Sequence, residues 1–307
     1  MAENSNRSRF PEWLRCRLSC ETTVRSTVAT LERLRINTVC QSAHCPNIAE
    51  CFSRRTATFL ILGKVCTRSC RFCAVRKGEP EPLDADEPTR VALAIAALGL
   101  RHAVITSVTR DDLPDGGSNE FAETVRTIRS RCDGVTIEVL VPDFRGDAEL
   151  IESVVVSRPD VFAHNVETVS RLYSSVRPGA DYDRSLCVLE VAKSRNPEVM
   201  TKSGIMVGMG ESWDEVVGVM KDLRSVQCNI FTVGQYLSPS REHYPVVEFV
   251  PPAVFADYAT VGGELGFEHV ASGPLVRSSY MADVAFFSAM EEGDWRDGVR
   301  SESAGYR

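Results

Sequence analysis

The sequence predicts an α/β protein with a partial (β/α)6 barrel of the TIM type, and three observations support this fold. Strand and helix signals alternate along residues 57–265. The strand signals are short and almost continuously apolar, which is typical of a parallel sheet with helices outside it. Polar residues follow the strand signals, at the carboxyl ends where parallel α/β sheets form their sites. A chain of 307 residues is long enough for one such domain.

The elements are expected in the following order. A helix is expected over residues 24–35, where apolar residues recur at helical spacing, and residues 37–53 predict a loop shaped by bound metal rather than by a core. Strands are expected at 57–63, 103–108, 135–141, 160–164, 199–207 and 229–233. Helices are expected at 89–98, 119–131, 147–156, within 166–195, after the capping box Ser212–Glu215, and at 253–265.

Three regions follow from this pattern. Residues 1–53 form an N-terminal extension that contains the first cysteines, and residues 54–265 form the (β/α)6 core. Residues 266–307 show no sheet pattern and predict a C-terminal tail.

Composition restricts the class of protein. Hydrophobic residues make up 43% and charged residues 25%, as in ordinary globular proteins. The net charge is -7 and the Lys and Arg residues are scattered, which argues against nucleic acid as the main partner. The apolar runs are far shorter than the ~20 residues that span a bilayer, so no membrane segment is predicted. Residues 1–9 contain no apolar signal core, and we expect a cytoplasmic location.

A group of three cysteines follows the first predicted strand. Cys66, Cys70 and Cys73 have the spacing C-x3-C-x2-C, and six of the 11 cysteines lie between residues 40 and 73. The odd number, without a secretory signal, disfavours a disulfide framework. A ferredoxin gives each of the four irons of a cubane a cysteine, so three local thiolates leave one iron free for another ligand. Zinc signatures use other spacings, and a redox or structural thiol cluster is the alternative.

A second group of cysteines lies just upstream. Cys40, Cys45 and Cys51 have the spacing C-x4-C-x5-C. The first gap matches that of plant-type ferredoxins and the second does not. A zinc knuckle or a plain electron-transfer cluster is the alternative for this triplet.

Polar residues at the predicted strand ends are candidates for ligand binding. Asn165 and Glu167 could hold ribose hydroxyls, whereas a histidine such as His164 is by default a hydrogen-bonded structural residue. The stretch Gly208–Glu211 could let the backbone approach an adenine or a methionine moiety closely, or it could form only the turn before the capping box.

The motifs resemble those of a known family. C-x3-C-x2-C with Phe72 before the last cysteine resembles the signature of the radical S-adenosylmethionine (SAM) superfamily. With the second triplet and Gly273–Tyr280, the sequence resembles the lipoyl synthase family. Further similar stretches are Thr106–Leu113, His164–Val169, Thr201–Gly204 and Gly234–Ser240, so that the resemblance extends over residues 38–283. Lys64 and Met281 depart from the family pattern, and neither change removes a ligand.

The resemblance implies an activity and a set of site residues. Such proteins insert two sulfur atoms at C6 and C8 of a protein-bound octanoyl group, using SAM and two 4Fe-4S clusters. The cluster that chelates SAM would be held by Cys66, Cys70 and Cys73. An auxiliary cluster that donates the sulfur would be held by Cys40, Cys45, Cys51 and Ser279. Spacing alone does not separate Ser279 from Ser278. We also expect SAM contacts from Phe72, Ser107, Asn165 and Glu167.

The implied partners follow from this activity. They are octanoylated lipoyl domains of 2-oxoacid dehydrogenases and the glycine-cleavage H protein, an electron donor such as ferredoxin or flavodoxin, and an iron-sulfur carrier for cluster repair. Nucleic acid and membrane are not expected as partners. Two other functions fit part of the pattern: another sulfur-inserting radical SAM enzyme, and a non-catalytic two-cluster electron carrier.

Overall fold

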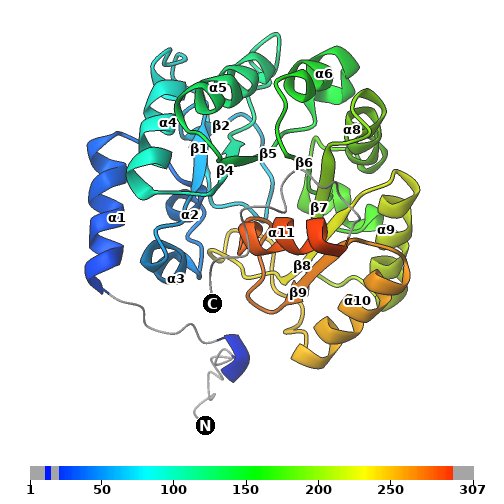
Figure 1. Ribbon diagram of the computed structural model, residues 1–307. Coiled ribbons are helices and arrows are strands. Elements are labelled where there is room, and N and C mark those ends of the chain that lie inside the picture. The colour runs from blue at the N-terminus through cyan, green and yellow to red at the C-terminus, as the bar shows by residue number, and fades with distance from the viewer. Residues whose placement is uncertain (1–10, 15–20, 293–307) are drawn as a thin grey trace.

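The computed structural model describes residues 11–14 and 21–292, and at its centre is a seven-stranded sheet (Figure 1). The strands are β1 (Thr58–Ile61), β4 (His102–Ser107), β5 (Thr136–Leu140), β6 (Val161–Ala163), β7 (Met200–Val207), β8 (Ile230–Gln235) and β9 (His269–Gly273). Every neighbouring pair is parallel, and the order in the sheet is the order in the chain. The first six are the predicted strands, so the α/β fold with a partial barrel is confirmed.

Helices alternate with the strands and surround the sheet (Figure 1). They are α4 (Glu87–Leu98), α5 (Ser118–Arg131), α6 (Ala148–Val156), α8 (Tyr182–Arg195), α9 (Trp213–Ser225) and α10 (Pro252–Glu264). The predicted capping box begins α9: the Glu215 carboxylate accepts from Ser212 N at 2.8 Å, and Ser212 Oγ accepts from Glu215 N at 3.3 Å. Shorter helices are η1 (Glu12–Leu14), η2 (Phe144–Gly146), η3 (Ser170–Leu172) and α7 (Tyr173–Val176).

The prediction of a loop over residues 37–53 is wrong. This segment contains α2 (Val39–Ser42) and α3 (Ile48–Ser53), and it follows the predicted N-terminal helix, α1 (Glu21–Arg33). Phe52 is 1% exposed and Cys40 is 7% exposed, so side chains packed into the core shape the segment. Thr27 of α1 donates a hydrogen bond to the Phe52 carbonyl at 2.8 Å. The helices are too short to give a periodic apolar pattern.

The prediction that residues 266–307 lack sheet structure is also wrong. β9 pairs with β8, and α11 (Ala282–Glu292) follows it. All five residues of β9 are half-buried, and its sequence His-Val-Ala-Ser-Gly has no long apolar run. The signal that identified the other strands is therefore absent from this one.

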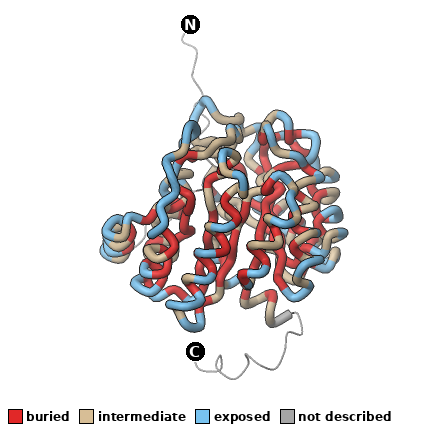
Figure 2. The backbone as a smooth tube through the Cα atoms, turned by 90° about the horizontal axis from the view of Figure 1, so that it is seen from above, coloured by how far each residue is buried: buried red, intermediate tan, exposed pale blue. Residues whose placement is uncertain are grey.

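The core lies between the sheet and the helices, and α11 closes one end of the barrel. Figure 2 shows the strands as buried and the outer faces of the helices as exposed. Phe286 of α11 lies against His102, with 5.6 Å between ring centroids. The apolar contacts of α11 include the first residues of three strands: Val161, Met200 and Ile230. Inside this layer, Lys202 Nζ donates to both carboxylate oxygens of Glu138, at 2.8 and 2.9 Å. The N-terminal ends of the strands are thus covered.

The two edge strands, β1 and β9, are joined by the segments next to them, and we call this junction the seam. Each edge strand has one neighbour among the described strands. Asn47 Nδ2 donates to the carbonyl of Leu275 at 2.7 Å. The Tyr280 hydroxyl donates to the Glu50 carboxylate at 2.9 Å. The N-terminal extension and the C-terminal tail therefore meet where the sheet would otherwise be open.

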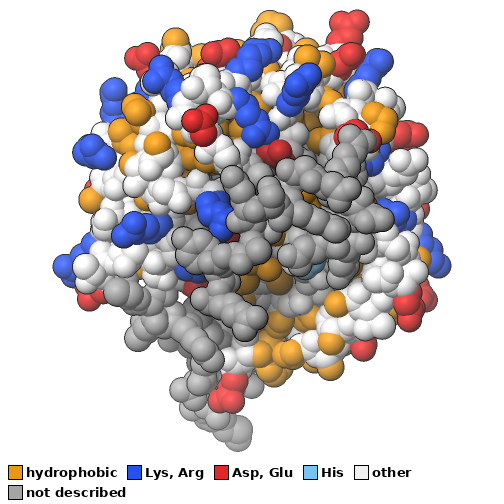
Figure 3. Space-filling model, in the orientation of Figure 1, with side chains coloured by type: hydrophobic (Ala, Val, Ile, Leu, Met, Phe, Trp, Pro, Cys, Tyr) orange, Lys and Arg blue, Asp and Glu red, His pale blue; other side chains and the backbone are white. Residues whose placement is uncertain are grey.

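The surface carries both signs of charge. Figure 3, in the orientation of Figure 1, shows Lys and Arg side chains spread around the edge of this face together with Asp and Glu. Among the described helices, none has the length and apolar composition that would let it cross a membrane. Residues 1–10, on which the expectation of a cytoplasmic location depends, lie outside the described residues.

Candidate functional site

The first cysteine triplet lies on a loop that leaves the C-terminal end of β1. Leu62 and Gly63 turn the chain with left-handed φ angles of 67° and 90°. The buried Glu87 carboxylate at the start of α4 accepts from Leu62 N at 2.7 Å and holds this turn. Two short strands, β2 (Val65–Cys66) and β3 (Arg76–Lys77), pair and close the loop on itself. The loop is therefore fixed at its entry and at its base.

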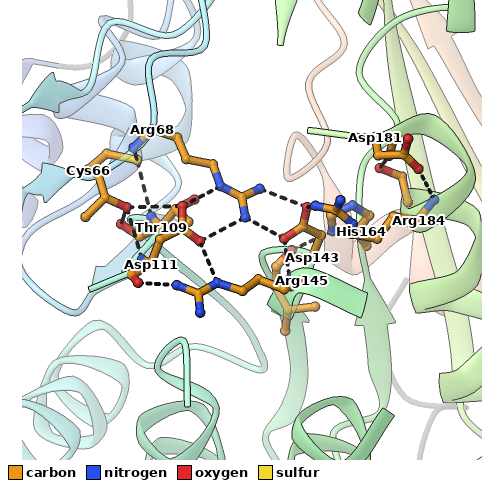
Figure 4. A network of polar contacts seen from close by, with 12 residues as sticks. Cys66, Arg68, Thr109, Asp111, Asp143, Arg145, His164, Asp181 and Arg184 are labelled. Atoms are coloured by element: carbon orange, nitrogen blue, oxygen red, sulfur yellow. Dashed lines mark hydrogen bonds and ion pairs between the residues drawn. The ribbon is translucent and has the colours of Figure 1, made fainter. Parts of the chain in front are cut away.

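Arg68 joins the cysteine loop to the segments that follow β4 and β5 (Figure 4). Its guanidinium donates to both carboxylate oxygens of Asp111, at 2.8 and 2.9 Å, and to both of Asp143, at 2.9 and 2.7 Å. Burial would raise the pKa of Asp143, but the hydrogen bonds and charge of Arg68 hold this pKa well below its ordinary value. Two bidentate pairs fix the orientation of the loop as well as its position.

Backbone N–H groups point at the sulfur of Cys66. Arg68 N and Thr109 N donate to Cys66 Sγ at 3.4 and 3.3 Å. Hydrogen bonds to ligand sulfurs are one of the means by which a protein tunes an iron-sulfur cluster.

Residues 236–250, which follow β8, contact the second half of the cysteine loop. Tyr244 N donates to the Arg71 carbonyl at 2.8 Å, and the Arg71 guanidinium lies 5.5 Å from the centre of the Tyr244 ring. His243 Nε2 lies 3.2 Å from the carbonyl oxygen of Cys73. No sequence motif predicts these contacts. The stretch Gly234–Ser240, which resembles the family pattern, ends three residues before His243.

The second triplet lies on α2, on α3 and between them. Burial, together with the charges of Cys40 and Cys45, raises the pKa of Cys51 to about 12. Burial also raises the pKa of Cys40, and the charge of Cys45 adds to this. These effects require the three thiols to lie near one another. A cation would offset the unfavourable interaction between their thiolates, so this donor set fits a metal cluster.

The structure brings both triplets to one cavity of about 520 Å³ at the C-terminal ends of the strands. Five of the six cysteines line it: Cys40, Cys45, Cys66, Cys70 and Cys73. All six are free thiols. No group of three His, Cys, Asp or Glu side chains within residues 11–14 and 21–292 is arranged around a single metal ion. The triplets line a larger space, and soft thiolates around such a space suit iron-sulfur clusters.

The residues expected to contact SAM line the same cavity. They are Phe72, Ser107, Asn165 and Glu167. Glu167 has a left-handed φ of 66°, which is strained for a residue with a side chain. Its carboxylate accepts from Asn165 Nδ2 at 3.1 Å. Burial raises the pKa of Glu167, and the charge of Arg177 opposes the shift.

Three buried polar atoms of cavity-lining residues have no hydrogen-bond partner among the described residues. They are Ser107 Oγ, His164 Nε2 and Arg177 Nε. Burial and the charge of Arg177 lower the pKa of His164 to about 4, so its imidazole is neutral near pH 7. His164 Nδ1 donates to the Val141 carbonyl at 2.8 Å, which leaves Nε2 as an acceptor. Because buried polar groups are almost always paired, these atoms indicate a polar ligand in the cavity.

The two candidate serines point to different parts of the site. Ser279 Oγ accepts from the Thr58 hydroxyl at 2.7 Å, and Thr58 lies close enough to Cys40 to oppose the rise that burial causes in the pKa of its thiol. Ser278 Oγ donates to Asn165 Oδ1 at 3.1 Å. Ser279 therefore lies beside the second triplet, and Ser278 lies beside the residues expected to contact SAM.

Gly234 of β8 allows the serine segment to approach the sheet. A Cβ atom at this position would lie 2.0 Å from the Val276 carbonyl oxygen. We expect Gly234→Ala to lower the free energy of unfolding by about 1–3 kcal/mol, as overpacking does, and to displace the segment that carries Ser279. Thermal unfolding measures the loss of stability. The iron content of the reconstituted protein measures whether the segment that carries Ser279 has been displaced.

Gly218 in the interior of α9 provides the matched control. A Cβ there would meet no atom within 4 Å, and alanine favours a helix by about 0.5–1 kcal/mol over glycine. Gly218→Ala should therefore be neutral or stabilising. Equal unfolding temperatures for Gly234→Ala and the unmodified protein would contradict the close approach.

Comparison with known families identifies proteins similar to this one. The model of the Radical SAM superfamily matches residues 60–223. A lipoyl synthase of Caldanaerobacter subterraneus is 60% identical over 276 residues, which cover 90% of this chain and 96% of the relative. A lipoyl synthase of Rubrobacter xylanophilus is 55% identical, with 89% and 85% of the two chains covered.

Solved structures with low sequence identity share the fold. A maturase of FeFe-hydrogenase has a TM-score of 0.54 at 13% identity, covering 84% of this chain and 62% of its own. Methylornithine synthase has a TM-score of 0.51 at 14% identity, covering 87% and 86%. These two likenesses concern the arrangement of the barrel alone.

Proposed function

This chain belongs to the lipoyl synthase family of radical SAM enzymes, and from this premise we propose which of its residues hold the two clusters and the substrate. The protein is a sulfurtransferase that inserts two sulfur atoms at C6 and C8 of an octanoyl group carried on a protein lysine. Its cofactors are SAM and two 4Fe-4S clusters.

Cys66, Cys70 and Cys73 would hold the cluster that chelates SAM. The observation that carries this proposal is the position of the three thiols in the same cavity as unpaired polar atoms of Ser107, His164 and Arg177. An amino-acid cofactor with a ribose and an adenine presents many polar atoms that could pair with them. Glu167 and Asn165 would bind ribose hydroxyls, and Phe72 would contact an apolar part of the cofactor.

Cys40, Cys45, Cys51 and Ser279 would hold the auxiliary cluster. The position of Thr58 supports this set, because Thr58 donates a hydrogen bond to Ser279 and lies close to Cys40. The cluster would then lie between the N-terminal extension (1–53) and the C-terminal region (266–307), whose strand β9 completes the sheet of the core (54–265). We propose these three regions as the functional divisions of the chain.

When bound, reduced cluster and SAM supply a 5′-deoxyadenosyl radical that removes hydrogen from unactivated carbon, and the auxiliary cluster supplies sulfur. The chain must hold the reacting groups in contact and exclude water. Arg68, paired with Asp111 and Asp143, holds the cysteine loop at the strand ends. The layer around Phe286 and the Lys202–Glu138 pair fills the opposite end of the barrel. The octanoyl chain would therefore enter at the C-terminal ends of the strands.

The substrate protein is a lipoyl domain or a protein of that type. We propose octanoylated lipoyl domains of 2-oxoacid dehydrogenases and the glycine-cleavage H protein as carriers. The reaction also requires an electron donor such as ferredoxin or flavodoxin. Because sulfur donation consumes the auxiliary cluster, an iron-sulfur carrier would rebuild it.

The proposed function is tested by anaerobic incubation with SAM, a reductant and an octanoylated lipoyl domain, followed by mass analysis. We expect a product with two added sulfur atoms and about eight irons per reconstituted chain, from two four-iron cubanes. Free octanoate should be converted poorly, because only the carrier brings a tethered chain to the cavity mouth.

Other outcomes identify the alternatives. An electron carrier would hold iron without consuming SAM. A different sulfur-inserting enzyme would consume SAM without forming the lipoyl group. Equal conversion of free octanoate and the carrier would contradict recognition of the carrier protein.

A further inference from the structure

The half of the cysteine loop between Cys70 and Cys73 is held from two sides. Arg71 N donates to the Val176 carbonyl at the end of α7, at 2.8 Å. On the other side, the Arg71 carbonyl accepts from Tyr244 N at 2.8 Å. The Tyr236 hydroxyl in turn donates to the Tyr244 carbonyl at 2.7 Å, which fixes the 236–250 segment against the end of β8. This segment is therefore a rigid support for the loop.

His243 connects this segment to Cys73, a proposed ligand of the SAM cluster. A carbonyl oxygen can only accept, so the 3.2 Å contact with the Cys73 oxygen requires the proton on His243 Nε2. In the neutral imidazole His243 Nδ1 is then an acceptor, and the Ser240 hydroxyl lies 2.8 Å away to donate to it. Ser240 Oγ itself accepts from Glu242 N at 3.2 Å. The hydrogen bonds run in one direction, from Glu242 through Ser240 and His243 to Cys73.

We infer that His243 is a positioning residue for the SAM cluster. Its hydrogen bond holds the backbone of Cys73, one of the proposed ligands. The inference rests on the proposed assignment of Cys66, Cys70 and Cys73. Cys73 is the last ligand of the loop, and Arg68 anchors only the half between Cys66 and Cys70. Without His243, the backbone at Cys73 would lose a hydrogen bond, and the loop could open more often at this end. Partners in the outer shell of a metal site commonly tune the ligands in this way.

The experiment uses the reconstituted holoenzyme, in which the auxiliary cluster is an internal reference. The reduced SAM cluster is followed by its electron paramagnetic resonance signal, which changes when SAM binds, during challenge with an iron chelator. We expect His243→Ala to lose this signal about fivefold faster than the unmodified protein, the factor that corresponds to one hydrogen bond. The auxiliary signal should be lost at an unchanged rate.

Two further variants separate positioning from general stability. His243→Gln retains an N–H donor at a similar reach and should restore most of the resistance to chelator. Glu242→Ala is the matched control, because it shortens an exposed neighbour whose backbone, not its side chain, takes part in the contacts; it should behave as the unmodified protein.

Three results would overturn the inference. His243→Ala with an unchanged rate would show that the contact does not hold the loop. Equal acceleration at both clusters would indicate loss of general stability instead of positioning. A wild-type protein without a SAM-responsive signal would overturn the cysteine assignment itself, and the role of His243 with it.

Discussion

Replacing Cys70 by alanine is expected to abolish the cleavage of SAM. Three thiolates hold three irons of a cubane, and the fourth iron binds the cofactor. With two thiolates left, the loop cannot retain a cluster with a defined open iron, so the reducing electron does not reach the cofactor. Formation of 5′-deoxyadenosine, measured under anaerobic conditions with excess reductant, should fall to the background of the protein-free reaction.

Two other cysteine variants define what this result means. Cys45→Ala removes a ligand of the second triplet, and we expect it to stop sulfur insertion while 5′-deoxyadenosine is still formed. Cys187→Ala removes a free thiol of α8 that belongs to neither triplet, and it should retain both activities. If Cys70→Ala and Cys45→Ala, both folded and reconstituted, lost SAM cleavage equally, the two triplets would not have separate roles.

Replacing Ser279 by alanine is expected to suppress lipoyl product with little loss of SAM cleavage. An alkoxide is a harder ligand than a thiolate and is matched less well to cluster iron, so protonation could release it and free an iron as sulfur leaves. Without this ligand the auxiliary cluster would keep its three cysteines but not its defined fourth iron. We expect product yield to fall by roughly 100-fold or more, because loss of a direct ligand should cost at least as much as the largest effects of outer-shell changes at metal sites. Mass analysis of the carrier, with iron content measured on the same sample, tests this.

The neighbouring serine provides the comparison. Ser278→Ala removes the hydrogen bond to Asn165 and should raise the KM for SAM, yet at saturating SAM the product should still carry two sulfur atoms. Ser279→Cys should hold the cluster more tightly and release sulfur less readily. Unmodified yields from Ser279→Ala with both clusters intact would reject the assignment and leave the fourth iron to another ligand.

The parts of the fold that could be predicted from the sequence are those with a local signal. Six strands could be predicted because each contains a short stretch of buried apolar residues, and α9 could be predicted from its capping box. β9 was missed because half-buried residues at the edge of a sheet need no apolar run. The segment 37–53 was misassigned because α2 and α3 are shorter than the windows in which helical periodicity can be recognised.

The candidate site likewise contains residues that have a local sequence signal and residues that have none. The two cysteine triplets could be singled out as candidate ligands from their spacing, since each triplet is local in sequence. The contacts of Arg68 and His243 could not, because Asp143 is 75 residues from Arg68, and His243 is 170 residues from Cys73. Such pairs are brought together only by the order of strands around the barrel. The position of Ser279 beside Cys40 depends on a similar distant contact, through Thr58.

The seam also determines how tightly the two edges of the sheet are held together after sulfur has been donated. A cluster bound to Cys40, Cys45, Cys51 and Ser279 would be a covalent cross-link between the segments next to the first and last strands of the sheet. Sulfur donation dismantles that cross-link and leaves the hydrogen bonds of the seam, such as that from Asn47 to Leu275, to hold the edges together. We therefore expect the spent enzyme to be looser along this edge than the loaded enzyme. Under the proposed ligand set, this edge would also be the place where iron and sulfide are returned to the auxiliary site, so the loss of the cluster would itself make the empty site more accessible.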